Sequence, residues 1–206
     1  MHAIARPTTL LLAHGNAEDL ALTEPLVRFL VRRLREQWPK VRIIFRGDSG
    51  FCRQRIINYC ERASVHYIVG LARNPRLQQI TEFLELAMKE EFQLTGVKQR
   101  QIGEFRYAAQ SWTTKRRVIT RLEYGDGGGN PRYVVTNLEG DAAELYDDVY
   151  CQRGEAENRI RQAQAGLFAT RTSYHHLQSN QLRMLLAALG YVLIDRLRTL
   201  ALKGTK

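Results

Sequence analysis

Two acidic side chains in this sequence have the settings in which catalytic carboxylates are found. Glu157 follows Tyr150 and Arg153 at spacings that bring the three side chains onto one face of a helix, because successive helical residues are about 100° apart. Asp48 follows the apolar run 41–46, which predicts a strand that delivers this acid at its carboxyl end. Catalytic groups in α/β sheets collect at that end of the strands. Both acids are therefore candidates for chemistry.

Each setting also has a simpler interpretation that the residues leave open. The helix face can be a solvated surface on which Arg153 pairs with Glu157 and Glu157 pairs with Arg161. The glycines on either side of Asp48 can form an ordinary turn after a strand, with no function.

The two elements together resemble the DDE transposases of bacterial insertion sequences. That group is marked by a Tyr, Arg, Glu, Lys signature around its last catalytic acid, and Tyr150, Arg153 and Glu157 have its spacing. The segment 46–51, Arg-Gly-Asp-Ser-Gly-Phe, is similar to the family's second-aspartate motif. Further similar segments are Gly70–Asn74, Gly103–Tyr107 and Arg171–Ser173, and the resemblance runs from about Leu10 to about Gly204.

This resemblance implies DNA transposition by metal-dependent cleavage and transfer of DNA strands. It implies that Asp48 and Glu157 are catalytic acids and ligands of Mg²⁺ or Mn²⁺, since such cations prefer carboxylate oxygens. The implied partner is DNA at the transposon ends. The implied DNA-binding residues are Tyr150, Arg153, Arg161 and Gln164. Gln164 stands where the family has lysine, so one phosphate contact is expected to differ.

The family's first aspartate has no counterpart at a strand position of this sequence. In the ribonuclease-H-like fold it lies on the first strand, two strands before the one predicted at Thr8–Ala13. The acids upstream of Asp48 are Glu18, Asp19, Glu24 and Glu36, which fit a loop or a helix. We therefore expect weak metal binding, little or no turnover by this chain alone, and self-association. The expected protein partner is a second copy in a homodimer or a complementing amino-terminal transposase chain, and the complementing chain would supply the missing part.

The composition agrees with a nucleic-acid partner. Lys and Arg number 31 against 21 Asp and Glu, which gives a formal net charge of +10. Many of the arginines are spread along the predicted helices, and arginine suits phosphate recognition because its charge is permanent.

Three cysteines without a C-x-x-C pair predict neither a disulfide framework nor a zinc site. We expect a cytoplasmic protein with no membrane segment, because no apolar run approaches the ~20 residues of a membrane span.

The order of predicted elements favours an α/β fold with a ribonuclease-H-like core that is incomplete at its N-terminus. An antiparallel β insertion is expected before the helix that carries Glu157. The expected division is a partial core at 1–96, the insertion at 97–140 and a helical part of the core at 141–206. The predicted strands are Thr8–Ala13, Val41–Arg46, His66–Leu71, Lys98–Ala109, Arg116–Tyr124 and Arg132–Leu138. The predicted helices are Glu24–Trp38, Arg53–Ala63, 75–93, Ala142–Gln164 and Leu177–Leu200.

Several packing roles follow from the same patterns. Thr23 is expected to cap the first helix, whose apolar side would be Leu26, Phe29, Leu30 and Leu34. The apolar run Met184–Ile194 predicts a buried core helix. Trp38, Trp112 and Met184 are expected to pack in the core or in the insertion.

Two other functions remain open at this point. The segment Gly47-Asp48-Ser49-Gly50 also resembles the nucleophile segment of serine hydrolases, but Phe51-Cys52 and the Tyr174-His175-His176 segment depart from those families. A non-catalytic module that binds nucleic acid through its basic surface is the other alternative.

Overall fold

The computed structural model describes residues 17–152, 154, 158, 161–162 and 176–201. It divides into two compact units, one formed by Leu11–Arg153 and the other by Met1–Leu10 together with Gly154–Lys206. The sheet and the Asp48 loop belong to the first unit. The predicted strand Thr8–Ala13 lies outside the described residues.

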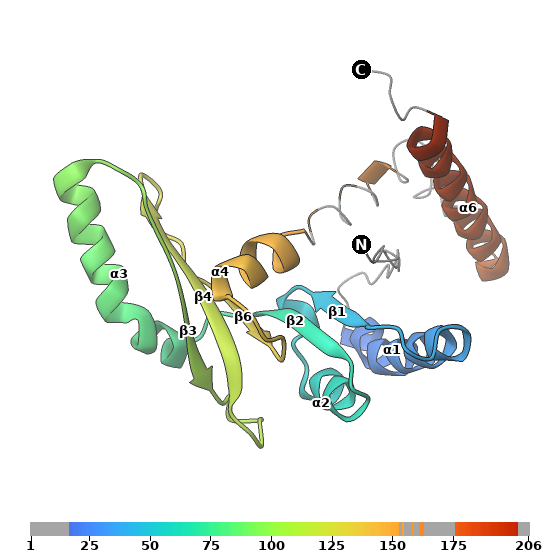
Figure 1. Cartoon of the computed structure of the whole chain (residues 1–206), viewed down its shortest axis with the longest axis horizontal. Helices are drawn as coiled ribbons and strands as arrows, with labels where there is room; N and C mark the ends of the chain where they lie inside the picture. Colours follow the sequence, from blue (N-terminus) through green and yellow to red (C-terminus); the bar gives the residue numbers. More distant parts are fainter. Residues whose placement is uncertain (1–16, 153, 155–157, 159–160, 163–175, 202–206) are drawn as a thin grey trace. The chain divides into compact units, whose positions relative to one another are not determined.

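The first unit is a mixed α/β fold with a six-stranded mixed sheet (Figure 1). Its strands are β1 (Ile44–Gly47), β2 (His66–Leu71), β3 (Gln99–Tyr107), β4 (Arg116–Gly125), β5 (Gly128–Gly129) and β6 (Arg132–Thr136). They are ordered β1-β2-β6-β4-β3, and the short β5 pairs with β4. Only β1 and β2 run parallel among these pairs, since the contacts of β2 with β6, β6 with β4 and β4 with β3 are antiparallel.

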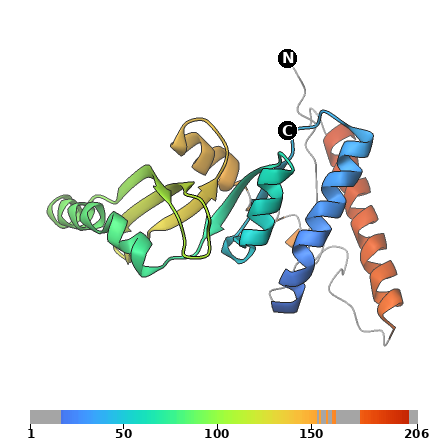
Figure 2. The same cartoon turned by 90° about the horizontal axis from the view of Figure 1, so that it is seen from below.

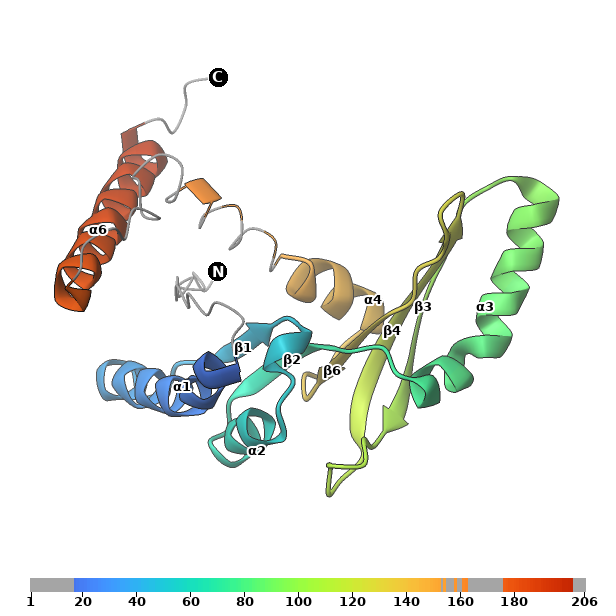
Figure 3. The same cartoon turned by 180° about the vertical axis from the view of Figure 1, so that it is seen from behind.

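The strands alternate between two cores, one on each face of the sheet. Tyr67 and Val69 of β2 point into the first core, and Ile68 between them points into the second. On the first face lie α1 (Ala17–Gln37), α2 (Gln54–Arg62) and α3 (Pro75–Thr95), which contribute buried side chains to the first core. Figure 2 shows α1 and α2 side by side, and Figure 3 shows α3 running along β3 and β4.

The second face is covered by the short helix α4 (Ala142–Glu144) and the π-helix η2 (Leu145–Tyr150) that continues it. Leu145 and Tyr146 are buried against Ile68, Ile119 and Val134 of the sheet. Asp141 starts this segment by accepting hydrogen bonds from the amides of the first helical turn. The segment that carries Tyr150 is therefore fixed directly on the sheet.

The antiparallel strands after residue 97 were correctly predicted, and they continue the same sheet as β1 and β2. Residues Ile68–Leu71 of β2 pair in register with Tyr133–Thr136 of β6. The turn predicted at 126–131 contains β5 and Gly128, which has a positive φ of 80°. Strand β2 has the predicted bounds, and α3 begins at the predicted Pro75, where the Asn74 side chain accepts from the Leu77 amide.

The prediction for the first helix is wrong in two respects. Helix α1 begins at Ala17 and continues through Pro25, so Thr23 lies inside the helix as a buried side chain and does not cap it. The buried side is formed by Thr23, Val27 and Val31 at four-residue spacing. Of the predicted apolar side, Leu26 and Phe29 are exposed and Leu30 and Leu34 are half-buried.

Two packing predictions are also wrong, and one is confirmed. Trp38 is 61% exposed, because it follows the last residue of α1 at the surface. The run Met184–Ile194 lies in α6 (Leu177–Ala201), where Met184 is half-buried but Leu185 is 68% exposed. The described residues of that unit contain no second long helix to cover this run. Trp112 is buried as expected and packs edge-on against Tyr107.

Among the described residues, no helix has both the length and the apolar character to cross a membrane.

Candidate active site at the end of strand β1

Asp48 lies where the sequence places it, directly after the last residue of β1. It caps the short 3-10 helix η1 (Ser49–Phe51), and its Oδ1 accepts a hydrogen bond of 2.8 Å from the Gly50 amide. The side chain is exposed. The loop therefore fixes one carboxylate oxygen through the backbone and presents the acid to solvent.

Tyr150 meets the Asp48 loop over Gly70 of β2. A methyl group at Gly70 would lie 2.8 Å from the Tyr150 hydroxyl oxygen, 2.9 Å from the Ser49 nitrogen and 3.1 Å from the Asp48 carbonyl carbon. Carbon atoms do not approach other heavy atoms this closely without a shift, so only glycine leaves room for the contact. The second-aspartate motif and the tyrosine of the signature thus come together in the structure.

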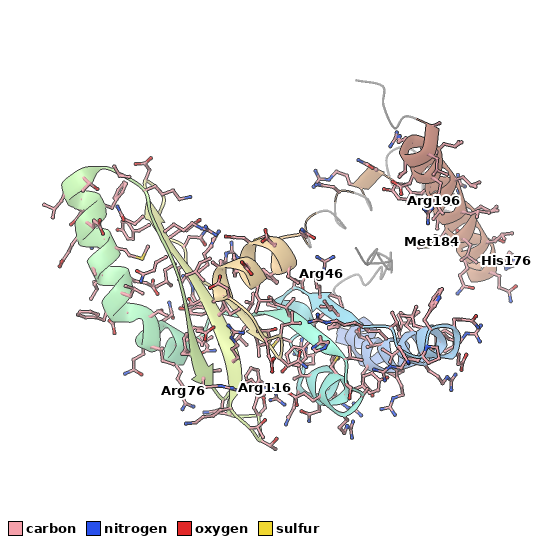
Figure 4. All side chains as sticks on the ribbon, in the orientation of Figure 1. Arg46, Arg76, Arg116, His176, Met184 and Arg196 are labelled. Carbon is pink, nitrogen blue, oxygen red and sulfur yellow. The ribbon has the colours of Figure 1, made fainter. Side chains whose placement is uncertain are left out.

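Arg46 provides a second connection between the two motifs. Its Nη1 donates a hydrogen bond of 2.9 Å to the carbonyl oxygen of Val149, 103 residues along the chain. Figure 4 shows Arg46 reaching from β1 toward the end of η2. The strand that carries Asp48 therefore also holds the backbone next to Tyr150.

The helix before Tyr150 is wound more widely than predicted. The Cys151 amide donates to the Tyr146 carbonyl oxygen five residues earlier, which is the hydrogen bond of a π-helix. The expectation of an unbroken α-helix from Ala142 is wrong here, and a turn follows at Cys151 and Gln152. The angular positions deduced for 100° per residue therefore do not apply across Leu145–Tyr150. Such π segments occur frequently at functional sites.

Arg121 and Arg132, which the sequence patterns do not single out, lie near Tyr146, the ring that packs against the signature tyrosine Tyr150. The Tyr146 ring is 5.5 Å from the Tyr150 ring, and the Arg121 guanidinium lies 5.7 Å from the Tyr146 ring. Arg132 faces Arg121 across the β4–β6 pair. Burial raises the pKa of Tyr146 to about 12, so this phenol remains neutral at physiological pH. The pairing of the two strands around the 126–131 turn is the signal that would have identified Arg121 and Arg132.

Arg121 and Arg132 differ in how their charge is compensated. Arg121 forms an ion pair of 3.2 Å with Glu123, whereas Arg132 is exposed and has no ion pair within the described part of the chain. The exposed Arg132 guanidinium can therefore accept a phosphate, and the half-buried Tyr150 ring can stack on a base.

The remaining predicted residues are not brought together by the described structure. Arg153, Glu157 and Gln164 lie outside the described residues, and Arg161 is exposed in the second unit. Within the described ranges, no group of three or more acidic, His or Cys side chains could hold a metal ion. Asp48 fits a hard cation through its carboxylate, but it is a single ligand and does not form a metal site alone.

The fold and the site define a mixed α/β domain with an exposed acid at a strand end, beside an aromatic and cationic surface. Residues 3–206 match the family described as Transposase DDE domain group 1. The chain therefore belongs to this family, which implies a role in DNA transposition, DNA binding and use of a divalent metal. No curated protein and no solved structure matches the chain.

Proposed function

We propose that this chain is the carboxyl-terminal part of the catalytic domain of an insertion-sequence transposase, with Asp48 and Glu157 as two of its catalytic acids. The observation that supports this most directly is the close approach at Gly70, where the Asp48–Ser49 backbone and the Tyr150 hydroxyl lie against the same point of β2. A chance resemblance of two short motifs would not require them to meet. Family membership favours this function over a serine hydrolase that uses Ser49.

Each residue has a distinct role in this proposal. Asp48 and Glu157 would hold Mg²⁺ or Mn²⁺, which activates the attacking oxygen and stabilises the leaving oxygen in phosphodiester chemistry. The Gly50 amide orients the Asp48 carboxylate. Tyr150, Arg153, Arg161 and Gln164 would contact DNA at the transposon ends, with Arg132 as an additional phosphate contact.

The first acid of the triad would come from a strand next to β1. Strand β1 is the end of the described sheet, and a strand added in parallel along it would finish near Asp48. We propose that residues beyond this sequence, in the same polypeptide or in a complementing chain, complete a ribonuclease-H-like core. The division into a core at 1–96, an insertion at 97–140 and a helical part at 141–206 belongs to this proposal, as does a cytoplasmic location.

The metal dependence of DNA binding tests this assignment. We expect Mg²⁺ to strengthen binding of a fluorescent duplex relative to EDTA at equal ionic strength, because a cation can bridge carboxylates and phosphates. We call this gain in affinity the Mg²⁺ increment. Asp48→Asn and Glu157→Gln should each remove it. Asp126→Asn is the matched control, since Asp126 is an exposed acid in the turn after β4 and should leave the increment unchanged. Fluorescence anisotropy gives the affinities.

The possible outcomes separate the alternatives. Binding that weakens with salt but ignores both Mg²⁺ and the two acid substitutions would indicate a non-catalytic nucleic-acid-binding module. A chain that binds no DNA under any of these conditions would contradict both functions.

A further inference from the structure

A cavity of about 380 Å³ lies away from the Asp48 loop, among α1, α2 and the segment that leads into β4. Helices α1 and α2 cover the first face of the sheet, whereas Tyr150 lies over the second face. The lining includes Arg28, Arg55, Arg62 and Arg116, together with the exposed side chains of Thr113 and Thr114. The candidate active site uses none of these residues.

Arg116 forms the buried part of this lining, and its side chain is 4% exposed. It donates two hydrogen bonds to the Glu61 carboxylate, of 2.7 and 2.8 Å, and one of 2.9 Å to Asn58. Its guanidinium also lies 5.0 Å from the Trp112 ring. Figure 4 labels Arg116 beside β4. The Nη1 atom is buried and has no hydrogen-bond partner within the described part of the chain. Arg116 thus holds a fixed, incompletely satisfied positive charge at this place.

The charges around Arg116 leave an excess of cations. Arg116 is paired with Glu61, and Arg28 is paired with Glu24. Arg55 and Arg62 are exposed and have no carboxylate partner among the residues that the structure describes. Arg62 donates through Nε to the Asn58 carbonyl oxygen at 3.3 Å, which fixes its side chain along α2. The lining therefore offers the exposed guanidinium groups of Arg55 and Arg62, the second of them held by a hydrogen bond, together with the threonine hydroxyls, to an anion.

The cationic lining extends beyond this cavity. A neighbouring cavity of about 670 Å³ shares Glu61, Thr114 and Arg116 with it. It adds Arg106, Lys115, Arg117, Glu104 and Glu139, of which Arg117 and Glu104 form an ion pair. The exposed cations of the two cavities that have no ion pair in the described part of the chain are Arg55, Arg62, Arg106 and Lys115. A row of separate cations across two adjoining cavities suits successive phosphates of one strand better than a single small anion.

We propose that this row binds the phosphate backbone of duplex DNA, at a site separate from the DNA contacts beside Asp48. The inference rests on the proposed function in taking DNA as the partner. DNA would then be held on the α1–α2 side of the sheet as well as beside Tyr150.

The salt dependence of DNA binding in the double variant Arg55→Ala/Arg62→Ala tests the site. Loss of two phosphate contacts should reduce the magnitude of the slope of log K against log salt by about 1.8, since each contact contributes roughly 0.9. The control is Arg32→Ala/Arg33→Ala, which removes the same charge from α1, where both arginines are paired with Glu36. Circular dichroism should show unchanged folding in both, because all four side chains are exposed.

The outcomes distinguish this site from the candidate active site. Equal slopes for the wild type and the Arg55/Arg62 variant, or equal losses in both double variants, would overturn the second DNA site. A reduced slope with the Mg²⁺ increment retained is the expected result. A reduced slope in a chain without any Mg²⁺ increment would support the second DNA site and contradict the catalytic assignment. A chain that binds no DNA would overturn both.

Discussion

Replacing Gly70 by alanine should lower the free energy of unfolding by about 1–3 kcal/mol, as expected for an extra methyl group in a closely packed place. The added carbon would lie within 3.1 Å of the Tyr150 hydroxyl and of the Asp48–Ser49 backbone, and the backbone cannot rotate away as a side chain can. Tyr150 and the Asp48 loop should therefore separate. Urea unfolding measures the loss, and the Mg²⁺ increment in DNA binding should disappear with it.

Gly103 provides the matched control because it is also a strand glycine. The nearest atom to a methyl group at Gly103 would be Thr120 Cγ2 at 3.7 Å, which is an ordinary contact. Gly103→Ala should be neutral or stabilise the fold by up to about 1 kcal/mol, since alanine restricts the unfolded chain. Equal unfolding midpoints for the two variants would show that the close approach over Gly70 does not constrain the site.

Glu61→Ala should be strongly destabilising because it leaves the Arg116 guanidinium buried without its carboxylate. Breaking a buried ion pair from one side costs about 3–5 kcal/mol, and we expect about 3 kcal/mol because the Glu61 side chain is 36% exposed. Glu104→Ala is the control, since its ion pair with Arg117 involves a carboxylate that is 49% exposed and should matter by less than about 1 kcal/mol. Similar losses in the two variants would contradict the argument from burial.

The same pair predicts how stability depends on pH. Hydrogen bonding to Arg116 lowers the pKa of Glu61 below its ordinary value, and the Tyr67 hydroxyl acts in the same direction. A lowered pKa contributes stability above the unfolded value of about 4.3, and this contribution is lost as the pH falls through the folded pKa. As the pH is lowered below about 5, the free energy of unfolding should therefore fall more for the wild type than for Glu61→Gln. Parallel stability curves for the two proteins would contradict this coupling.

Local signals were sufficient for most elements of the first unit. Strand His66–Leu71 was predicted because its apolar residues are bounded by turn residues, and α3 because Asn74-Pro75 is a strong helix start. The buried side of α1 differs from the prediction because the helix has a leucine and phenylalanine side as well as a side with Val27 and Val31, and helical spacing alone does not say which of them meets the sheet. The pairing of β6 with β2 joins residues far apart in sequence, so periodicity does not reveal it.

The candidate site was predictable in its residues but not in its geometry. Asp48 at the end of β1 follows from the strand pattern, and Tyr150 follows from the signature spacing. The close approach over Gly70 depends on packing between distant segments, and the π-helix depends on one hydrogen bond displaced by a residue. Neither is encoded in local composition. Arg121 and Arg132 could be identified only once the register of β4 and β6 was known.

The position of β6 between β2 and β4 also has a consequence during synthesis of the chain. Strand β2 is complete at Leu71, but its antiparallel partner is complete only at Thr136, roughly 65 residues later. At about 5–20 residues per second, a ribosome needs on the order of 3–13 s to add that length. Throughout that interval the edge of β2 that β6 later covers is available to other chains, and open strand edges are sites of aggregation. To avoid aggregation, the nascent chain therefore needs the open edge of β2 to be covered until β6 has been synthesised.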